Sequence, residues 1–312
     1  MSNDNDDDDI SLDEQDYQLR LSRNIFGNPG NDEELSDSED QDGISQHEWT
    51  CANDDVSIIY HLAFLAPGHG DSLWNSSRCI AEHILDAERR ADLFGSLQLD
   101  NKHNKCNWPP RTCLEIGAGA ALPSLALIKE GSQRVVLTDR LVNQQTFDAL
   151  KLSIEKNASA WNIDEEDIRR RAAIADHSWG EEIERLLQVV TAESNDANDS
   201  EDEKSFVDLL IASDCIYNPC YHAALLQSAS ALIQPSTGIF IVGYSLHGNV
   251  PPSHVERFFT EAKREYGLDV IHELVVEYSE GQIGIGSLDE NRGNVYLKVL
   301  ACRDSIHCKD SR

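Results

Sequence analysis

The sequence predicts an α/β fold with a doubly wound, mostly parallel β-sheet, and three observations lead to it. Residues 111–124 (RTCLEIGAGAALPS) have the pattern of a short apolar strand, a glycine turn and the beginning of a helix. Four strand–helix units follow one another from Arg111, as expected of βαβ connections. Residues 206–211 (FVDLLI) form a nearly continuous apolar run, which is typical of a central strand buried on both faces.

Periodicity and helix-ending residues place the other elements. The hydrophobic periodicity predicts a strand at residues 56–65, before the core, and an amphipathic helix at residues 76–85. The helix after the glycine turn covers residues 122–129 and ends at Gly131, since glycine is the usual residue just beyond a helix. Further strands are expected at residues 134–139, 238–244, 270–276 and 295–302, and residues 174–180 are expected to form the end of another strand. A helix is expected at residues 253–263.

The glycine turn predicts a nucleotide site. Glycine lets the backbone approach a ligand, and the following helix start presents free N–H groups to ligand oxygens. Glu115 stands two residues before Gly117, where it would repel a pyrophosphate, and Leu122 occupies the third glycine position of the dinucleotide fingerprint. A carboxylate here suits a cationic ligand end, so the motif favours S-adenosylmethionine over NAD. The alternative is an ordinary tight turn with a chance glutamate.

Polar and aromatic residues stand at the expected strand ends. Asp139 lies about 20 residues beyond Gly119, the spacing at which a βαβ nucleotide site places its ribose ligand. A solvated loop carboxylate is the alternative for Asp139. Trp179 could lie near an adenine face or belong to the core. The buried run FVDLLI delivers residues 212–217 (ASDCIY) to the carboxyl edge of the sheet, where open α/β sheets bind ligands.

Five motifs in this order resemble the seven-β-strand methyltransferases of the protein-lysine branch. They are GDSLW, CLEIGAGAALPS, VVLTD, ADHSWG and DLLIASDCIY, and the likeness extends over residues 55–303. This branch includes the fungal group labelled nicotinamide N-methyltransferase-like and the elongation-factor lysine methyltransferases. The resemblance implies a Rossmann-like, doubly wound, seven-stranded sheet whose last strand is antiparallel, with S-adenosylmethionine as the cofactor.

The resemblance also implies a role for each matching residue. Those expected to hold the cofactor are Trp74, Glu115, Gly117, Ala118, Gly119, Asp139, Trp179 and Ser213. Asp214 and Tyr217 match the D-x-x-Y signature beside the target amine and are the expected catalytic residues. Ala121 departs from the pattern, since many methyltransferases carry a third glycine there, but it is small enough for the turn to pack. By their position after the fifth strand, Tyr244 and His247 are candidates to line the acceptor pocket.

Methyl transfer to an amine demands alignment more than elaborate acid–base chemistry. Orienting the reactants for in-line displacement can supply most of the rate. A lysine target arrives protonated, so Asp214 and Tyr217 are expected to hold the ammonium and then orient the neutral amine. His177 and His222 are candidate bases, although a loop histidine is more often a satisfied polar residue. Cys215 shows no adjacent base that would activate it, and no cysteine–histidine spacing indicates a metal site.

The 312 residues carry a formal net charge of −30, concentrated in two segments. Residues 1–50 hold 16 acidic and 2 basic residues, so they are predicted to form a disordered arm. The methyltransferase domain is predicted over residues 51–303, with an acidic loop insertion at residues 190–205 and a tail at residues 304–312. The scattered cysteines and the lack of a signal or membrane-length apolar run favour a cytoplasmic location, with the nucleus as the alternative.

The charge also bears on partners, because a nucleic-acid binder needs basic surface. A protein substrate is expected, with a translation factor as a candidate, and neither nucleic acid nor membrane; the chain is expected to be a monomer. Three functions stay open at this point. The leading hypothesis is methylation of a lysine or N-terminal amine of a protein. The others are a small-molecule, nicotinamide-like N-methyltransferase and a non-catalytic module that binds S-adenosylmethionine.

Overall fold

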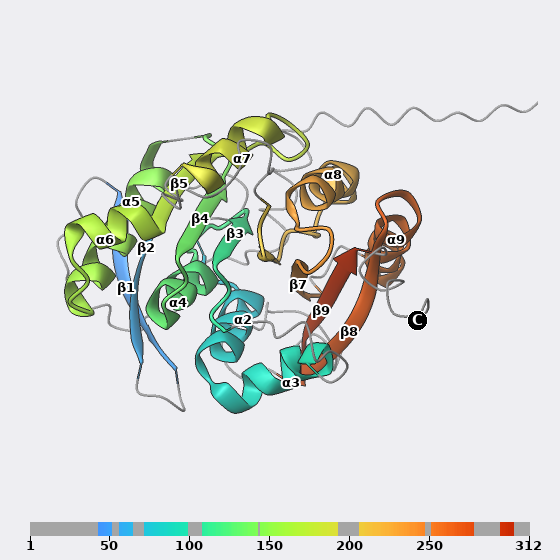
Figure 1. The fold of residues 1–312 in the computed structure, drawn as a ribbon, viewed down its shortest axis with the longest axis horizontal. Coiled ribbons are helices and arrows are strands. Elements are labelled where there is room, and N and C mark those ends of the chain that lie inside the picture. The colour runs from blue at the N-terminus through green and yellow to red at the C-terminus, as the bar shows by residue number, and fades with distance from the viewer. Residues whose placement is uncertain are drawn as a thin grey trace, which may run out of the picture.

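A seven-stranded β-sheet forms the centre of the molecule (Figure 1). The structure, a computed structural model, describes residues 43–51, 56–64, 72–98, 108–142, 144–192, 206–246, 251–277 and 294–302. Among these residues, no helix has both the length and the apolar character needed to cross a membrane.

The strands of this sheet lie in the order β5-β4-β3-β6-β7-β9-β8. Their bounds are β3 (Thr112–Ile116), β4 (Arg134–Asp139), β5 (Ala172–Asp176), β6 (Leu209–Ser213), β7 (Ile239–Ser245), β8 (Leu268–Glu277) and β9 (Asn294–Cys302). Strands β3 to β7 pair in parallel, whereas β9 pairs antiparallel with both β7 and β8. The predicted Rossmann-like sheet with an antiparallel last strand is confirmed, and β9 lies inside the sheet with β8 at the edge.

Helices cover both faces of the sheet. The first face carries α2 (Asn75–Leu85), α4 (Leu122–Glu130) and α5 (Gln144–Ala160), with α3 (Ala87–Gln98) and α6 (Glu165–Arg171) at its margins. The opposite face carries α7 (Ile183–Thr191), α8 (His222–Leu232) and α9 (Pro252–Glu265), with the short 3-10 helix η1 (Pro219–Tyr221) before α8. These two layers enclose two hydrophobic clusters, one on each side of the sheet.

The central strands read as continuous apolar runs because their alternating side chains are buried on both faces. In β3, Cys113 belongs to the cluster of the first face and Leu114 to that of the second. In β6, Leu209 and Leu210 divide in the same way. Glu115 is the charged residue within this buried part of β3, with 1% of its surface exposed. A carboxylate in such a place calls for a specific partner.

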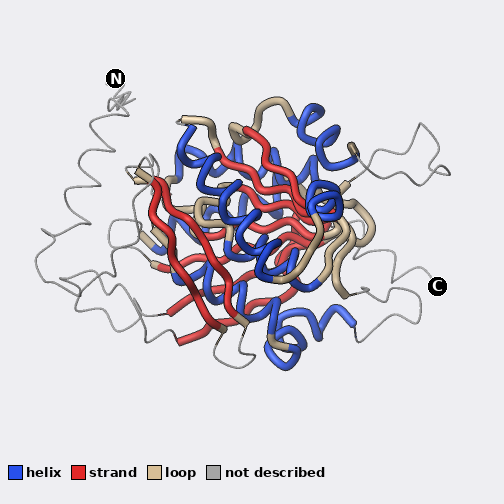
Figure 2. The backbone as a smooth tube through the Cα atoms, turned by 90° about the vertical axis from the view of Figure 1, so that its left-hand side faces the viewer, coloured by secondary structure: helices blue, strands red, loops and turns tan. Residues whose placement is uncertain are grey.

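A separate hairpin of β1 (Ile44–Thr50) and β2 (Ser57–Ala63) packs outside the first helical layer (Figure 2). The prediction that the disordered arm extends to residue 50 is therefore wrong for residues 44–50. These residues follow the acidic run and bring apolar side chains, including the partly buried Trp49, to the core. Residues 1–42 of the predicted arm, residues 193–205 of the predicted insertion and the predicted tail lie outside the described residues.

Helix α5 holds the hairpin by completing the hydrogen bonds of β2. The Ile59 N–H donates to Asn157 Oδ1 at 2.9 Å, and Asn157 Nδ2 donates to the Ile59 carbonyl at 2.5 Å. One turn earlier on α5, Ser153 Oγ accepts from the His61 N–H at 2.9 Å. One edge of β2 pairs with β1, and these side chains of α5 hydrogen-bond backbone groups along its other edge, where a neighbouring strand would otherwise pair. The hairpin is thereby fixed to the domain along that edge.

We expect Asn157→Ala to lower the free energy of unfolding by about 2–3 kcal/mol, because it leaves two backbone groups of Ile59 without their partner. Denaturant unfolding followed by circular dichroism measures the change. The matched control is Lys151→Ala on the same helix, which removes only an exposed 3.9 Å ion pair to Glu155 and should change stability by less than about 0.5 kcal/mol. Equal effects of the two substitutions would contradict the role of Asn157.

Candidate active site

The predicted site residues gather at the carboxyl edge of the sheet. Strands β3 and β6 are neighbours, yet the chain leaves β3 toward β4 on one side and β6 toward β7 on the other. This change of direction is a topological switch point, where an open α/β sheet leaves a crevice for ligands. Trp179 follows β5, Asp139 ends β4, and residues 117–119 follow β3. Residues 213–217 end and follow β6, and Trp74 directly precedes α2.

The backbone of Gly117 lines the crevice because no side chain fits there. Its φ is +64°, and a Cβ would lie 2.8 Å from Cys215 Sγ and 3.3 Å from Trp179 Cζ2. Cys215 is itself buried, and its thiol donates to the Ile116 carbonyl at 3.2 Å. The loop after β3, the segment after β6 and the segment after β5 therefore converge on one glycine.

The rest of the glycine turn is held by β4. The Ala118 N–H donates to the Thr138 carbonyl at 2.9 Å, and the Gly119 N–H donates to Asp139 Oδ2 at 2.9 Å. Desolvation of Asp139 raises the pKa of its carboxyl, and the hydrogen bonds from Gly119 and Arg140 lower it in part. Ala121 precedes α4 with φ +54°, the left-handed conformation that glycine adopts without strain. Thus Ala121 packs, as predicted, in a conformation that favours glycine.

Glu115 serves both the turn and the interior of the site. Its Oε2 accepts hydrogen bonds from the Ser124 N–H at 3.0 Å and from Ser124 Oγ at 2.6 Å, which satisfies the beginning of α4. Its Oε1 is buried and has no hydrogen-bond partner among the described residues. Burial raises the pKa of Glu115 to about 8, against the lowering effect of the hydrogen bonds from Ser124. A cation near Oε1 would favour the ionised carboxylate.

Trp179 lies close to the glycine turn, on the segment that follows β5. Its ring packs edge to face on Tyr221 with centroids 6.1 Å apart. The turn that carries it is fixed by Ser228, whose Oγ accepts from the Gly180 N–H at 2.7 Å and lies 2.9 Å from His177 Nε2. Burial lowers the pKa of His177. His177 therefore supports the position of Trp179, which agrees with its interpretation as a satisfied polar residue.

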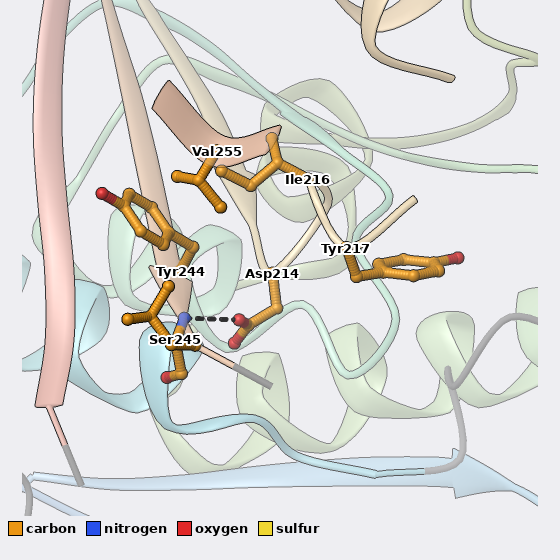
Figure 3. Close-up of a pocket in the computed structure, with 7 residues that line it drawn as sticks. Asp214, Ile216, Tyr217, Tyr244, Ser245 and Val255 are labelled. Carbon is orange, nitrogen blue, oxygen red and sulfur yellow. Dashed lines mark hydrogen bonds between the residues drawn. The ribbon is translucent and has the colours of Figure 1, made fainter. Parts of the chain in front are cut away.

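Asp214 joins three elements where β6 ends. Its backbone φ is +51°, and its N–H donates to the Gly243 carbonyl of β7 at 2.8 Å. Its Oδ1 accepts from the Ser245 N–H at 2.9 Å (Figure 3), and its Oδ2 accepts from Ser76 Oγ of α2. Ser213 Oγ lies 2.7 Å from the same Ser76 Oγ. Asp214 as a whole is 8% exposed, and these contacts hold its carboxylate in place.

A small pocket opens beside Asp214. Its lining also includes Ile216, Tyr217, Tyr244, Ser245, Leu246 and Val255. Figure 3 shows that the ring of Tyr217 points away from the Asp214 carboxylate. Burial raises the pKa of Tyr217 to about 12, and Asp139 and Arg140 are among the charges that act on it. The structure thus places the carboxylate beside the pocket, and it does not aim Asp214 and Tyr217 at a common point.

Three serines of the site were not predicted from the sequence. Ser124 had a signal, since it lies in the first turn of a helix whose N–H groups need acceptors. Ser76 and Ser245 had none, because they reach Asp214 only through the packing of distant segments. Tyr244 lines the small pocket beside Asp214, whereas His247 lies outside the described residues.

Two other residues considered from sequence are held in the interior. A ring nitrogen of His222 contacts the Ile216 carbonyl at 3.0 Å, and burial lowers its pKa. Burial raises the pKa of the Cys215 thiol well above its usual value, which disfavours a nucleophilic thiolate. Within the described part of the chain, no group of three or more histidine, cysteine or acidic residues is arranged to hold a metal ion. The site is suited to binding and alignment.

Comparison with known families adds a match over most of the chain. A family model described as lysine methyltransferase matches residues 53–265. A "Protein N-terminal and lysine N-methyltransferase EFM7" from Cryptococcus neoformans is 26% identical over 235 residues, covering 71% of this chain and 67% of the relative. The protein of the same name from Candida glabrata is 30% identical over 217 residues, covering 68% and 69%.

Solved structures share the fold. A Streptococcus mutans protein described as a proposed SAM-dependent methyltransferase aligns with a TM-score of 0.51 at 10% identity, over 85% of this chain. A proposed methyltransferase solved in complex with SAH aligns with a TM-score of 0.52 at 9% identity, also over 85% of this chain. The chain spans 57% of the length of each of these two proteins. At such identities the likeness establishes the fold alone.

The raised pKa of Glu115 predicts a pH-dependent difference between the wild type and Glu115→Gln. In the unfolded chain the carboxyl ionises near 4.5, whereas in the folded protein it keeps its proton to about 8. The contribution of Glu115 to stability is therefore present below the unfolded pKa and is lost as pH rises through that window. The stability of the variant relative to wild type should rise between these pH values, by at most about 1.4 kcal/mol per pH unit.

Urea unfolding of both proteins at several pH values across this window measures the effect. Taking the difference between the two proteins cancels the titration of the buried histidines, which both proteins share. A difference in the free energy of unfolding that stays constant with pH would contradict the raised pKa of Glu115.

Proposed function

The chain belongs to the lysine methyltransferase family, and from this premise we propose that it methylates an amine of a protein substrate, either a lysine side chain or an N-terminal amine. It is an S-adenosylmethionine-dependent methyltransferase. The observation that carries the proposal is the fixed carboxylate of Asp214, which stands beside a mainly apolar pocket one strand away from the glycine turn.

The crevice at the switch point fits this cofactor. The Gly117 backbone packs directly against Cys215 and Trp179 with no side chain between them, and Glu115 Oε1 is a buried oxygen without a partner in the described structure. We infer that Glu115 stabilises the positively charged end, that Asp139 binds the ribose and that Trp179 flanks the adenine. When bound, S-adenosylmethionine supplies a methyl group on a positively charged sulfur, ready for displacement.

The pocket beside Asp214 suits the aliphatic chain of a lysine. Ile216, Leu246 and Val255 offer apolar contacts, and Tyr244 adds an aromatic face. Asp214 attracts the incoming ammonium. After the ammonium has lost one proton to solvent, Asp214 orients the neutral amine by accepting a hydrogen bond from one of its two N–H groups. Holding nucleophile and methyl donor in line supplies most of the rate in such a site. Tyr217 stays a predicted catalytic residue, although its ring points away from the Asp214 carboxylate (Figure 3).

The charge of the chain supports a basic protein partner. The formal net charge of −30 attracts a positively charged substrate segment, although salt screens this attraction beyond ~10 Å. The relatives named above are described as acting on protein N-termini and lysines. We therefore favour a basic segment of a cytoplasmic protein, with a translation factor as the first candidate, methylated by the monomeric enzyme.

The acceptor can be identified by incubating the purified protein with tritiated S-adenosylmethionine and cell extract. We expect label in a protein band, and mass spectrometry of that band should find methyl groups on lysine or on the N-terminal amine. Label confined to the low-mass fraction would instead indicate a small-molecule acceptor, as the nicotinamide label of the similar fungal group suggests. Binding of the donor without any transfer would indicate a non-catalytic module. Either of these results would overturn the proposal.

We expect Asp214→Asn to reduce kcat on the order of 10²-fold, because it removes the charge that orients the amine. Asparagine has nearly the same shape and can still accept from the Ser245 N–H. The affinity for S-adenosylhomocysteine, measured by calorimetry, should change by less than about threefold. Parallel losses of turnover and cofactor affinity would contradict an acceptor-side role for Asp214.

A further inference from the structure

We propose that Ser76 is a positioning residue, which fixes the direction of the Asp214 carboxylate and so aligns the acceptor amine. The proposal rests on the methyltransferase function proposed above and deepens it. It assigns a role to the first turn of α2, a part of the chain that the D-x-x-Y signature does not include.

The contacts of Ser76 point to this role. Its side chain is fully buried, and its Oγ donates to Asp214 Oδ2. The nearby Ser213 Oγ, at 2.7 Å, can donate to Ser76 in turn, which leaves the Ser76 hydrogen for the carboxylate. Because the Ser245 N–H binds the other carboxylate oxygen, the carboxylate is gripped from α2 and from β7 at the same time.

Asp214 needs these hydrogen bonds because its backbone conformation alone does not fix the orientation of its carboxylate. The residue adopts a left-handed φ of +51°, which is uncommon for an aspartate and is held by its N–H bond to the Gly243 carbonyl. Rotation about the side-chain bonds would still turn the carboxylate away from the pocket. Two hydrogen bonds from different elements remove that freedom, and hydrogen bonds to a charged group are the stronger kind.

The same turn of α2 also reaches the donor side. Trp74, a predicted cofactor neighbour, directly precedes α2 and lies two residues before Ser76. The helix lies close to β7 because Gly243 has no side chain: a Cβ there would be 2.8 Å from Ile80 Cδ1 and 3.2 Å from Ser76 Cβ. The position of α2 thus sets both the donor-side tryptophan and the acceptor-side carboxylate.

The competing interpretation is that Ser76 only fills the space above Gly243. Ser76→Ala separates the two, because alanine keeps the Cβ that packs there and removes only the hydroxyl. The matched control is Ser77→Ala in the same helical turn, since Ser77 is also buried and makes no hydrogen bond to Asp214 or Ser213 in the structure. The two variants should melt within a few degrees of each other.

We expect Ser76→Ala to lower kcat by about 10- to 100-fold, with the affinity for S-adenosylhomocysteine changed by less than about twofold. In the Asp214→Asn background, adding Ser76→Ala should cost less than about threefold more, because the group that Ser76 orients has been altered. The amide of Ser245 should exchange its hydrogen faster in Ser76→Ala than in Ser77→Ala, as its bond to Asp214 loosens.

A normal kcat, equal losses in turnover and cofactor affinity, or a full multiplicative loss in the Asp214→Asn background would each overturn the positioning role. An unchanged Ser245 exchange rate would overturn it as well. If the wild-type protein transferred no methyl group to any acceptor, the proposed function would fail. The exchange rate of Ser245 would then still decide whether Ser76 holds Asp214.

Discussion

The site depends on how closely β3 and β6 approach each other just beyond their paired residues. A Cβ on Gly117 would lie 2.8 Å from Cys215 Sγ, so no side chain can separate the two segments. The crevice at the switch point is therefore lined by backbone, and the hydrogen bonds of the Ala118 and Gly119 amides fix that backbone to the end of β4. Because these hydrogen bonds hold the glycine turn in place, its conformation is preorganised before a ligand binds.

The carboxyl groups of Glu115, on β3, and Asp214, just after the neighbouring β6, lie in different environments. Glu115 is fully enclosed, and burial raises its pKa to about 8, so it takes up negative charge readily only beside a cation. Asp214 stands at the pocket, where the Ser245 amide and the Ser76 hydroxyl hold its oxygens. In our proposal the first group stabilises a charged donor and the second orients an amine. The same functional group, a carboxyl, thus serves both sides of the transfer, because burial and hydrogen bonding differ between Glu115 and Asp214.

Much of the frame was predictable, since its signals are local. The strand of residues 134–139 has the expected bounds, and α4 ends at Gly131, whose φ of +98° only glycine adopts easily. The carboxyl ends of parallel strands meet at one edge, so strand-end residues such as Asp139 could be grouped before the structure was known. The prediction failed at β1, where a half-buried strand directly follows an acidic run. The orientation of Tyr217 relative to Asp214 was also not foreseen.

By itself the sequence determined the order of strands and helices, the glycine turn and the identity of the groups at the strand ends. These follow from periodicity and backbone preferences that act over a few residues. The tertiary structure alone decided which groups meet, as when Ser76 reaches a carboxylate 138 residues away and Asn157 reaches Ile59 over 98 residues. The physical reason is that such hydrogen bonds require two packed surfaces to be in register. The sequence gives only weak signals of such long-range hydrogen bonds. One such signal is Gly243, whose lack of a side chain lets α2 approach β7.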